Sequence, residues 1–220
     1  MRAVAGWGRA PEPILVSTAG LLLAAGGGRR MGGAKALLRE PSGRRFVERG
    51  LAVLREAGCS PVLVVVGAQA EEVRGHAAAA DRVVEAPDWA AGQAASLRAG
   101  LAAVDETAAE AVCVLLVDLP DVDAEVVRRV VAAVTTGAPG DVPTPATAAG
   151  GDGRRVLGRA AYAGVPGHPV VIGRDHWDGV LASLQGDAGA RDYLATHAHV
   201  VVECGDLATG RDTDTPADLA

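Results

Sequence analysis

The chain has 220 residues, of which 49% are hydrophobic and only 3% aromatic, and its formal net charge is −6. This length suffices for one α/β domain with an aliphatic core. The negative charge argues against a general nucleic-acid binder and against adhesion to anionic membranes, so we expect neither partner.

The cysteine pattern and the N-terminal sequence indicate the cellular compartment of the protein. Cys59, Cys113 and Cys204 are far apart and form no C-x-x-C pair. The sequence shows no signal-peptide pattern and no apolar run of about 18 residues, so we expect a soluble cytoplasmic protein. Residues 1–13 lack any hydrophobic period and predict a flexible extension before a single domain at 14–220.

The first half of the chain alternates buried strands with amphipathic helices. Ser42 is expected to cap a helix that ends at Gly58, and Asp123 one that ends at Gly137. Strands are expected over Leu15–Ala25, Pro61–Val66, Arg82–Val84 and Ala111–Val117. Further helices are expected over Gln69–Ala80 and, after a loop at Asp88–Gln93, through Ser96–Val104.

In the second half, Val142–Ala146 is a candidate strand, and the turn Val165–His168 is expected to join two strands into a hairpin laid over the sheet edge. Two short helices and a last strand follow, at Trp177–Leu184, Ala190–His197 and Val200–Glu203. The whole pattern predicts a three-layer, Rossmann-like α/β fold, mostly parallel, with helices on both faces and a small β-hairpin over the substrate side.

A glycine-rich segment follows the first strand and carries the strongest functional signal. Between Leu21 and Lys35, glycines surround two arginines and a methionine. Such a backbone can turn its N–H groups toward an anion, and Arg30 and Lys35 add positive charge for a chain of phosphates. Neither the dinucleotide G-x-G-x-x-G pattern nor the G-x-x-x-x-G-K-[ST] loop fits, because Met31 and Ala34 interrupt them.

Carboxylates at other strand ends suggest a metal. Ligands of open α/β sheets bind beyond the carboxyl ends of the strands. Asp118 directly follows an apolar strand, and we interpret it as a Mg²⁺ ligand rather than a helix cap. Asp214 is either a second ligand or part of an Asx turn before a proline.

Other polar positions suggest substrate contacts. Gly92, beside Trp89, either contacts a nucleobase or belongs to a structural loop. His168 is expected near the second substrate, and Arg191 either neutralises an anionic substrate or pairs with Asp187. No nucleophile motif is present, which favours phosphoryl-type transfer by alignment and charge neutralisation.

The form L-A-A-G-x-G-x-R-M-G-x-x-K at Leu23–Lys35 resembles the signature of the MobA-like NTP transferase family, which includes molybdenum cofactor cytidylyltransferases. Five further segments resemble family motifs in the same order. They are Trp89–Leu97, Asp118–Pro120, Gly167–Pro169, Gly186–Arg191 and Asp212–Pro216.

The resemblance implies transfer of CMP from CTP to the terminal phosphate of molybdopterin, with release of pyrophosphate. It implies catalytic roles for Arg30, Lys35 and Asp118, Mg²⁺ binding by Asp118 and Asp214, and acceptor binding by His168, Asp187 and Arg191. The nucleotide-binding residues it implies are Leu23, Ala24, Ala25, Gly26, Gly27, Gly28, Arg30, Lys35, Gly92 and Ser96.

Two alternatives stay open from the sequence. The enzyme could act on a sugar phosphate or polyol phosphate, or the chain could be a non-catalytic nucleotide-binding chaperone of the cofactor. A client molybdoenzyme, or its chaperone, is a further partner that the resemblance implies.

Overall fold

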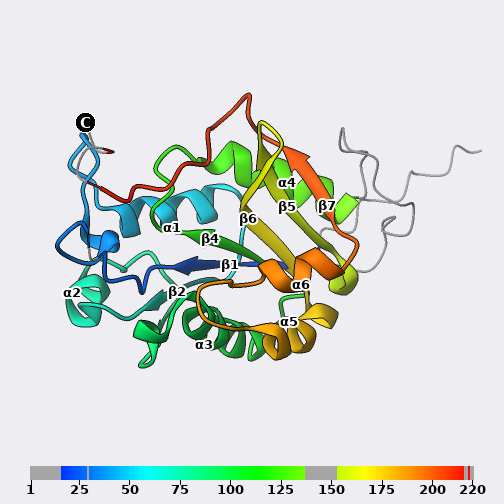
Figure 1. Cartoon of the computed structure of the whole chain (residues 1–220), viewed down its shortest axis with the longest axis horizontal. Helices are drawn as coiled ribbons and strands as arrows, with labels where there is room; N and C mark the ends of the chain where they lie inside the picture. Colours follow the sequence, from blue (N-terminus) through cyan, green and yellow to red (C-terminus); the bar gives the residue numbers. More distant parts are fainter. Residues whose placement is uncertain (1–15, 29, 137–152, 216–217, 219–220) are drawn as a thin grey trace, which may run out of the picture.

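The computed structural model describes residues 16–28, 30–136, 153–215 and 218 (Figure 1). The predicted extension at 1–13 and the candidate strand at 142–146 lie outside these residues. The described part contains a seven-stranded sheet in the order β3-β2-β1-β4-β6-β5-β7. Its strands are β1 (Thr18–Leu23), β2 (Val62–Val66), β3 (Arg82–Glu85), β4 (Ala111–Leu116), β5 (Leu157–Tyr162), β6 (Val165–Gly173) and β7 (Val200–Glu203).

The sheet is mostly parallel, which places several strand ends at one edge. Central β1 pairs in parallel with both β2 and β4, so that Leu21 lies opposite Leu63 on one side and Val114 on the other. β6 runs antiparallel to its neighbours β4 and β5, while β7 runs parallel to β5. The carboxyl ends of β1, β2 and β4 therefore share an edge, as predicted.

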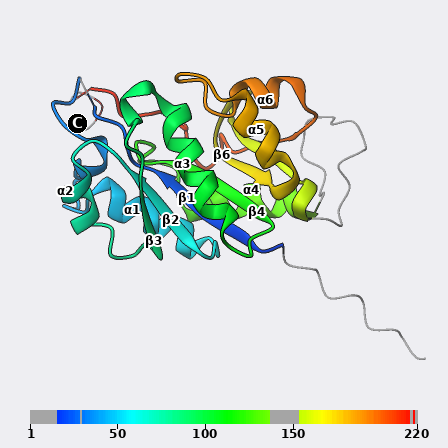
Figure 2. The same cartoon turned by 90° about the horizontal axis from the view of Figure 1, so that it is seen from below.

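Helices cover both faces of the sheet. In Figures 1 and 2, α1 (Phe46–Glu56) and α4 (Ala124–Thr136) lie on one face, and α3 (Gln93–Asp105), α5 (Trp177–Ser183) and α6 (Arg191–Thr196) lie on the other. The short helix α2 (Ala70–Gly75) packs beside β2. Single 3₁₀ turns complete the elements: η1 (Lys35–Leu37), η2 (Trp89–Ala91), η3 (Gly153–Arg155) and η4 (Arg174–His176). The predicted three-layer α/β class is confirmed.

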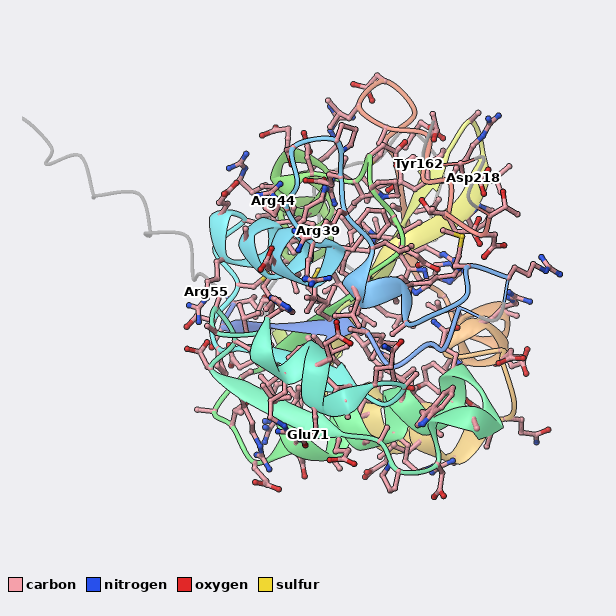
Figure 3. The ribbon with its side chains drawn as sticks, turned by 90° about the vertical axis from the view of Figure 1, so that its left-hand side faces the viewer. Arg39, Arg44, Arg55, Glu71, Tyr162 and Asp218 are labelled. Carbon is pink, nitrogen blue, oxygen red and sulfur yellow. The ribbon has the colours of Figure 1, made fainter. Side chains whose placement is uncertain are left out.

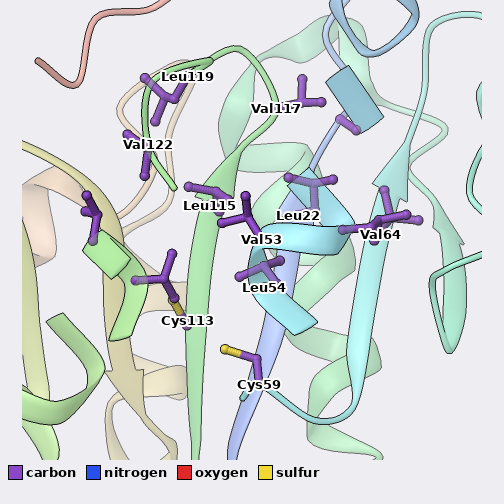
Figure 4. Packing of buried hydrophobic residues seen from close by; sticks show 14 of the residues in the cluster. Leu22, Val53, Leu54, Cys59, Val64, Cys113, Leu115, Val117, Leu119 and Val122 are labelled. Atoms are coloured by element: carbon purple, nitrogen blue, oxygen red, sulfur yellow. The ribbon is translucent and has the colours of Figure 1, made fainter. Parts of the chain in front are cut away.

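Strand β1 supplies side chains to both layers of the core. Leu22 packs in the layer under α1 and α4, whereas Leu21 and Leu23 pack in the layer under α3, α5 and α6. Figure 4 shows Leu22 among the aliphatic side chains of α1, β2 and β4. Burial on both faces explains why the central strands are apolar at every position rather than at alternate ones.

The cysteines belong to the structural core. Cys59, Cys113 and Cys204 are buried and free, and Figure 4 shows Cys59 and Cys113 in the layer under α1. A hydrogen bond with Cys59, together with burial, raises the pKa of the Cys113 thiol well above its usual value. Cys113 is therefore the buried, protonated thiol that the apolar context of its strand predicts.

The N-terminus of α1 differs from the prediction. Ser42 does not cap the helix; Arg45 is the N-cap residue, and its backbone N–H donates to Oε2 of Glu48 at 2.8 Å. Residues 39–45 instead form a small antiparallel turn, in which Glu40 N–H donates to the Arg44 carbonyl at 2.9 Å. The capping signal at Ser42 was outweighed by the turn tendency of its Pro-Ser-Gly context.

The predicted hairpin is present, but its turn is displaced toward the N-terminus. Ala163 and Gly164 form the two-residue turn, both with positive φ (51° and 78°), as tight hairpins require. Val165 to His168 therefore belong to β6, and β6 is inserted between β4 and β5 instead of lying over the sheet edge. His168 consequently projects from a strand rather than from a turn.

Charged side chains are concentrated on the outer surface. Figure 3 labels Arg39, Arg44, Arg55 and Glu71, all of which are exposed. Lys35 and Asp118 are among the exceptions, since their side chains are only 15% and 16% exposed at the carboxyl ends of strands. This contrast directs attention to that edge of the sheet.

Candidate functional site

The glycine segment leaves β1 and folds back on itself. The buried Ala24 and Ala25 continue beside β2, where Ala24 N–H donates to the Val65 carbonyl at 2.9 Å. Gly28 has a φ of +51°, and a Cβ there would lie 2.2 Å from the Gly33 carbonyl oxygen. Only glycine fits this close return of the backbone. We call residues 24–35 the glycine loop; Arg29 within it is outside the described residues.

The end of the glycine loop brings Lys35 to two carboxylates. Lys35 Nζ donates to Asp118 Oδ2 at 2.8 Å and also to Asp214 Oδ1. These partners are 83 and 179 residues away in the chain. The structure thus joins the predicted phosphate loop and both predicted metal ligands in one cluster.

Hydrogen bonds hold the C-terminal tail against the turn after β4. Thr213 N–H donates to the Asp118 carbonyl at 2.9 Å. Thr209 donates to Asp121 Oδ2 through both its backbone N–H and its hydroxyl, each at 2.6 Å. Figure 1 shows the tail running back across the molecule from β7 to end beside the glycine loop. The tail thereby carries Asp212 and Asp214 to the carboxyl ends of the parallel strands.

Three aspartates converge within this cluster. The carboxylate oxygens of Asp118, Asp212 and Asp214 lie within 4.8 Å of one another. Asp212 was not among the predicted ligands, although its spacing from Asp214 puts both on the same side of an extended chain. Carboxylate oxygens are the donors preferred by Mg²⁺ and Mn²⁺, so the donor set fits a hard divalent cation.

The charges in the cluster support one another. Burial opposes the charge on Lys35, but hydrogen bonds and attraction from Asp118 and Asp214 outweigh it and raise the pKa of Lys35. The hydrogen bond from Lys35 in turn lowers the pKa of Asp214. Both groups are therefore ionised at neutral pH, and the ammonium neutralises part of the carboxylate charge.

A cavity of about 400 Å³ opens beside this cluster, and we call it the loop cavity. Its wall joins the glycine loop to η2 and the start of α3. Predicted nucleotide-binding or catalytic residues in the wall are Leu23, Ala25, Gly26, Gly27, Lys35, Gly92, Ser96 and Asp118. Ala24 is buried in the core layer under α1, and Gly28 and Arg30 lie outside the wall.

The segment from Trp89 to Gln93 closes the far side of the loop cavity. Gly92 has a φ of +116°, and a Cβ there would lie 2.6 Å from the Gly186 carbonyl oxygen. Gln93 N–H donates to Asp187 Oδ1 at 3.2 Å. Asp187, predicted to contact the acceptor, thus lines the loop cavity, and Gln93 is a wall residue that the sequence did not single out.

A second cavity of about 610 Å³ lies between the hairpin and α6, and we call it the hairpin cavity. Its wall contains His168 and Arg191, both predicted to contact the acceptor, and also Arg159 of β5. Leu23, Gln93 and Leu116 line both cavities, so the two are neighbours. A nucleotide and an acceptor could therefore be bound side by side.

A buried arginine fixes the turn that carries Asp118. Arg49 of α1 donates to the carbonyls of Leu119 and Val122, at 3.1 and 2.8 Å, and pairs with Glu40 at 2.8 Å. Its side chain is only 9% exposed. This role could not be predicted from the sequence, because a single arginine in an amphipathic helix is ordinarily exposed.

The sequence is similar to one domain family and to named proteins. Residues 20–200 match the MobA-like NTP transferase domain. The chain is 36% identical over 200 residues to nicotine blue oxidoreductase of Paenarthrobacter nicotinovorans, covering 89% of this chain and 91% of that protein. It is 40% identical over 107 residues to a probable molybdenum cofactor guanylyltransferase of Opitutus terrae, covering 48% and 50% of the two chains.

Solved structures show the same architecture. The crystal structure of Rv0371c from Mycobacterium tuberculosis, in complex with manganese, superposes with a TM-score of 0.65 at 27% identity, covering 92% of this chain and 96% of that one. Among the described residues, no helix is both long enough and apolar enough to cross a membrane. Because the domain match spans most of the sequence, the chain belongs to the MobA-like NTP transferase family.

Proposed function

We propose that this nucleotidyltransferase transfers CMP from CTP to the terminal phosphate of molybdopterin and releases pyrophosphate. The observation that carries the proposal is the junction of the glycine loop, Lys35 and three aspartates, of which Lys35 and Asp118 line the loop cavity. The choice of CTP rests on the Leu-Ala-Ala-Gly form of the loop. The guanylyltransferase name of one relative makes GTP the nucleotide to compare with it.

The aspartates would hold the divalent cation, which we propose to be Mg²⁺. Asp118 and Asp214 were predicted as ligands, and Asp212 completes a set of three carboxylates. When bound, the cation would neutralise charge on the triphosphate as the leaving group departs. Related Rv0371c has been crystallised with manganese, which supports a divalent metal without choosing between Mg²⁺ and Mn²⁺.

The chain's own groups align the reactants. Backbone N–H groups of the glycine loop and the Lys35 ammonium would bind the triphosphate. An oxygen of the acceptor phosphate forms a bond to the α-phosphorus of CTP, while the bond from that phosphorus to the β-phosphate bridging oxygen breaks. The bond electrons leave with pyrophosphate.

No protein base is needed for this step. The second pKa of a phosphate monoester is about 6, so the group is largely ionised at neutral pH. The wall of the loop cavity accordingly offers charge and backbone donors rather than a histidine. A cytoplasmic setting and a client molybdoenzyme stay predictions from the sequence.

The test is a nucleotide panel with Mg²⁺ and purified molybdopterin carrying molybdenum. We expect pyrophosphate and a cytosine dinucleotide with CTP, and much less product with GTP, ATP or UTP. Preference for GTP would contradict the cytidylyl assignment but not the assignment as a nucleotidyltransferase. Turnover of a sugar phosphate or polyol phosphate in place of molybdopterin would contradict the acceptor.

A second candidate function comes from the relative named nicotine blue oxidoreductase, because its similarity covers most of both chains. An oxidoreductase that reduced nicotine blue would need an electron donor, and NADH and NADPH are the donors to try. The same purified protein can be assayed for loss of their absorbance in the presence of nicotine blue. Reduction without pyrophosphate release in the nucleotide panel would favour this function over the transferase.

A further inference from the structure

The hairpin cavity gathers positive charge without a matching carboxylate. Arg159 comes from β5, His168 from β6 and Arg191 from the start of α6, and all three line this cavity. Within the described ranges, neither guanidinium forms an ion pair. Asp212 also lines the cavity, but its carboxylate belongs to the aspartate cluster. In a chain of net charge −6, two unpaired arginines facing one cavity require an explanation.

Arg159 is held in place rather than free to swing into solvent. Its Nε and Nη2 both donate to the Gly167 carbonyl, at 3.3 and 3.2 Å, while Nη1 forms no hydrogen bond within the described part of the chain. The side chain is partly buried, as a guanidinium positioned for a ligand would be. One edge of the guanidinium is thus anchored to the hairpin, which leaves Nη1 available to an anion.

The electrostatics of the cavity agree with this arrangement. Burial, and then repulsion from Arg191, lower the pKa of Arg159. Burial, followed by the charges of Arg159 and Arg191, lowers the pKa of His168 to about 3. His168 is therefore neutral at pH 7 and can donate one N–H without adding charge. A bound anion would relieve the mutual repulsion of the two arginines.

We infer that Arg159, together with Arg191 and His168, forms a phosphate-binding subsite for the acceptor. The acceptor is then a phosphate monoester rather than a neutral alcohol, and Arg159 selects for its phosphate. This inference rests on the proposed transferase function, since it places the acceptor phosphate in the cavity next to the triphosphate. The sequence motifs contain His168 and Arg191 but not Arg159.

Calorimetric titration of the full chain tests the subsite without turnover. The probes are glycerol 3-phosphate, inorganic phosphate and, as the uncharged comparison, glycerol. Each titration is repeated in a Lys35→Ala background, so that phosphate bound at the glycine loop is not counted. We expect Arg159→Gln and Arg191→Gln each to weaken glycerol 3-phosphate binding about tenfold or more, because a charged hydrogen bond is lost.

Matched variants separate this role from a structural one. Arg128→Gln, on the exposed side of α4, should leave glycerol 3-phosphate affinity unchanged. Arg159→Lys keeps the charge but not the fork of donors, and should recover part of the affinity. Circular dichroism checks folding; if Arg159→Gln fails to fold, the exposed Arg191→Gln carries the test.

The outcomes for the subsite and for the transferase differ. Glycerol 3-phosphate affinity within about twofold of the parent in both Arg159→Gln and Arg191→Gln would overturn the subsite, as would binding of inorganic phosphate but not of the monoester. Affinity for CTP with Mg²⁺, measured separately, should be unchanged in both variants. If the parent protein did not bind CTP with Mg²⁺ but still bound the monoester in an Arg159-dependent way, the proposed transferase function alone would be overturned.

Discussion

At the scale of single residues, Lys35 links the glycine loop to the aspartate cluster. Its ammonium bonds two of the three aspartates directly, and the same carboxylates would coordinate a cation. The ammonium and a divalent ion are therefore alternative partners for one group of oxygens. A cation bound by these carboxylates would compete with Lys35 for their oxygens and would leave its ammonium available to a triphosphate, so we expect metal binding and nucleotide binding to be coupled.

Asp212 is the candidate metal ligand that this arrangement adds to the two predicted from the sequence. We expect Asp212→Asn to weaken Mn²⁺ binding about tenfold or more, because one anionic oxygen is removed from a three-carboxylate site. Electron paramagnetic resonance of free Mn²⁺ during titration measures the change. Asp178→Asn, exposed on α5, is the control and should bind Mn²⁺ as the parent does. If the Asp212 variant and this control bound Mn²⁺ with equal affinity, Asp212 would not be a metal ligand.

His168 gives the protein a defined acid sensitivity. Its pKa falls from 6.5 to about 3 on folding, so below pH 6.5 the unfolded chain takes up a proton that the folded chain does not. The free energy of unfolding should therefore decline as the pH drops from 6.5 toward 3. Above pH 6.5 His168 is neutral in both states, and the full unfolding free energy is retained. In urea titrations across this range, His168→Gln should show a shallower decline than the parent. A His199→Gln control should follow the parent; identical slopes for both variants would contradict the assignment.

At the scale of elements, helix α1 does more than cover the sheet. Arg49 reaches from α1 to two carbonyls in the turn after β4, which carries Asp118. The helix therefore fixes the turn that carries Asp118 into the aspartate cluster.

Removing the Arg49 guanidinium should cost both stability and metal affinity. Arg49→Met leaves the Leu119 and Val122 carbonyls and the Glu40 carboxylate without this partner, so we expect a loss of about 2–4 kcal/mol in unfolding free energy. Chemical denaturation measures it. Arg128→Met on the exposed side of α4 is the matched control and should change stability by less than about 0.5 kcal/mol. A similarly small change at Arg49 would mean that the turn is held by other contacts.

The glycine loop depends on one backbone conformation. Gly28→Ala should weaken CTP binding, because a Cβ at a φ of +51° would meet the Gly33 carbonyl and force the loop open. Gly75→Ala, with open space around its Cβ, serves as the matched control. Calorimetry with CTP and Mg²⁺ compares the two variants. Unchanged affinity for Gly28→Ala would show that the loop backbone does not contact the triphosphate.

At the scale of the whole molecule, the C-terminal tail meets the glycine loop at the carboxyl ends of the parallel strands. The tail after β7 crosses from the far side to reach the loop after β1 (Figure 1), so the site is complete only when the entire sheet is assembled. Binding at such a site should stabilise the fold as a unit.

We therefore expect CTP and Mg²⁺ together to raise the melting temperature. At a ligand concentration about 100 times Kd, the gain in unfolding free energy is about 2.7 kcal/mol. Differential scanning calorimetry should show a larger shift with both ligands than the sum of the shifts with each alone. Asp118→Asn should remove the metal-dependent part; an unaltered shift in that variant would exclude Asp118 from the metal site.

The sequence was most informative where local pattern and burial coincide. The apolar runs of β1, β2 and β4 predicted the strands, and the residues that follow them predicted which segments meet at the carboxyl ends of those strands. It failed where a competing local contact decided the outcome. The turn at residues 39–45 displaced the helix start from Ser42 to Phe46, and the αL pair Ala163–Gly164 moved the hairpin turn.

Residue type and position relative to apolar strands were enough to predict the α/β class, the glycine loop and the candidate roles of Lys35, Asp118 and Asp214. The folded arrangement was needed to show that Asp212 joins the aspartates, that Arg49 anchors their turn and that Arg159 faces the hairpin cavity. Each of these contacts joins residues far apart in the chain, and local periodicity carries no information about the side chain that a distant segment will meet.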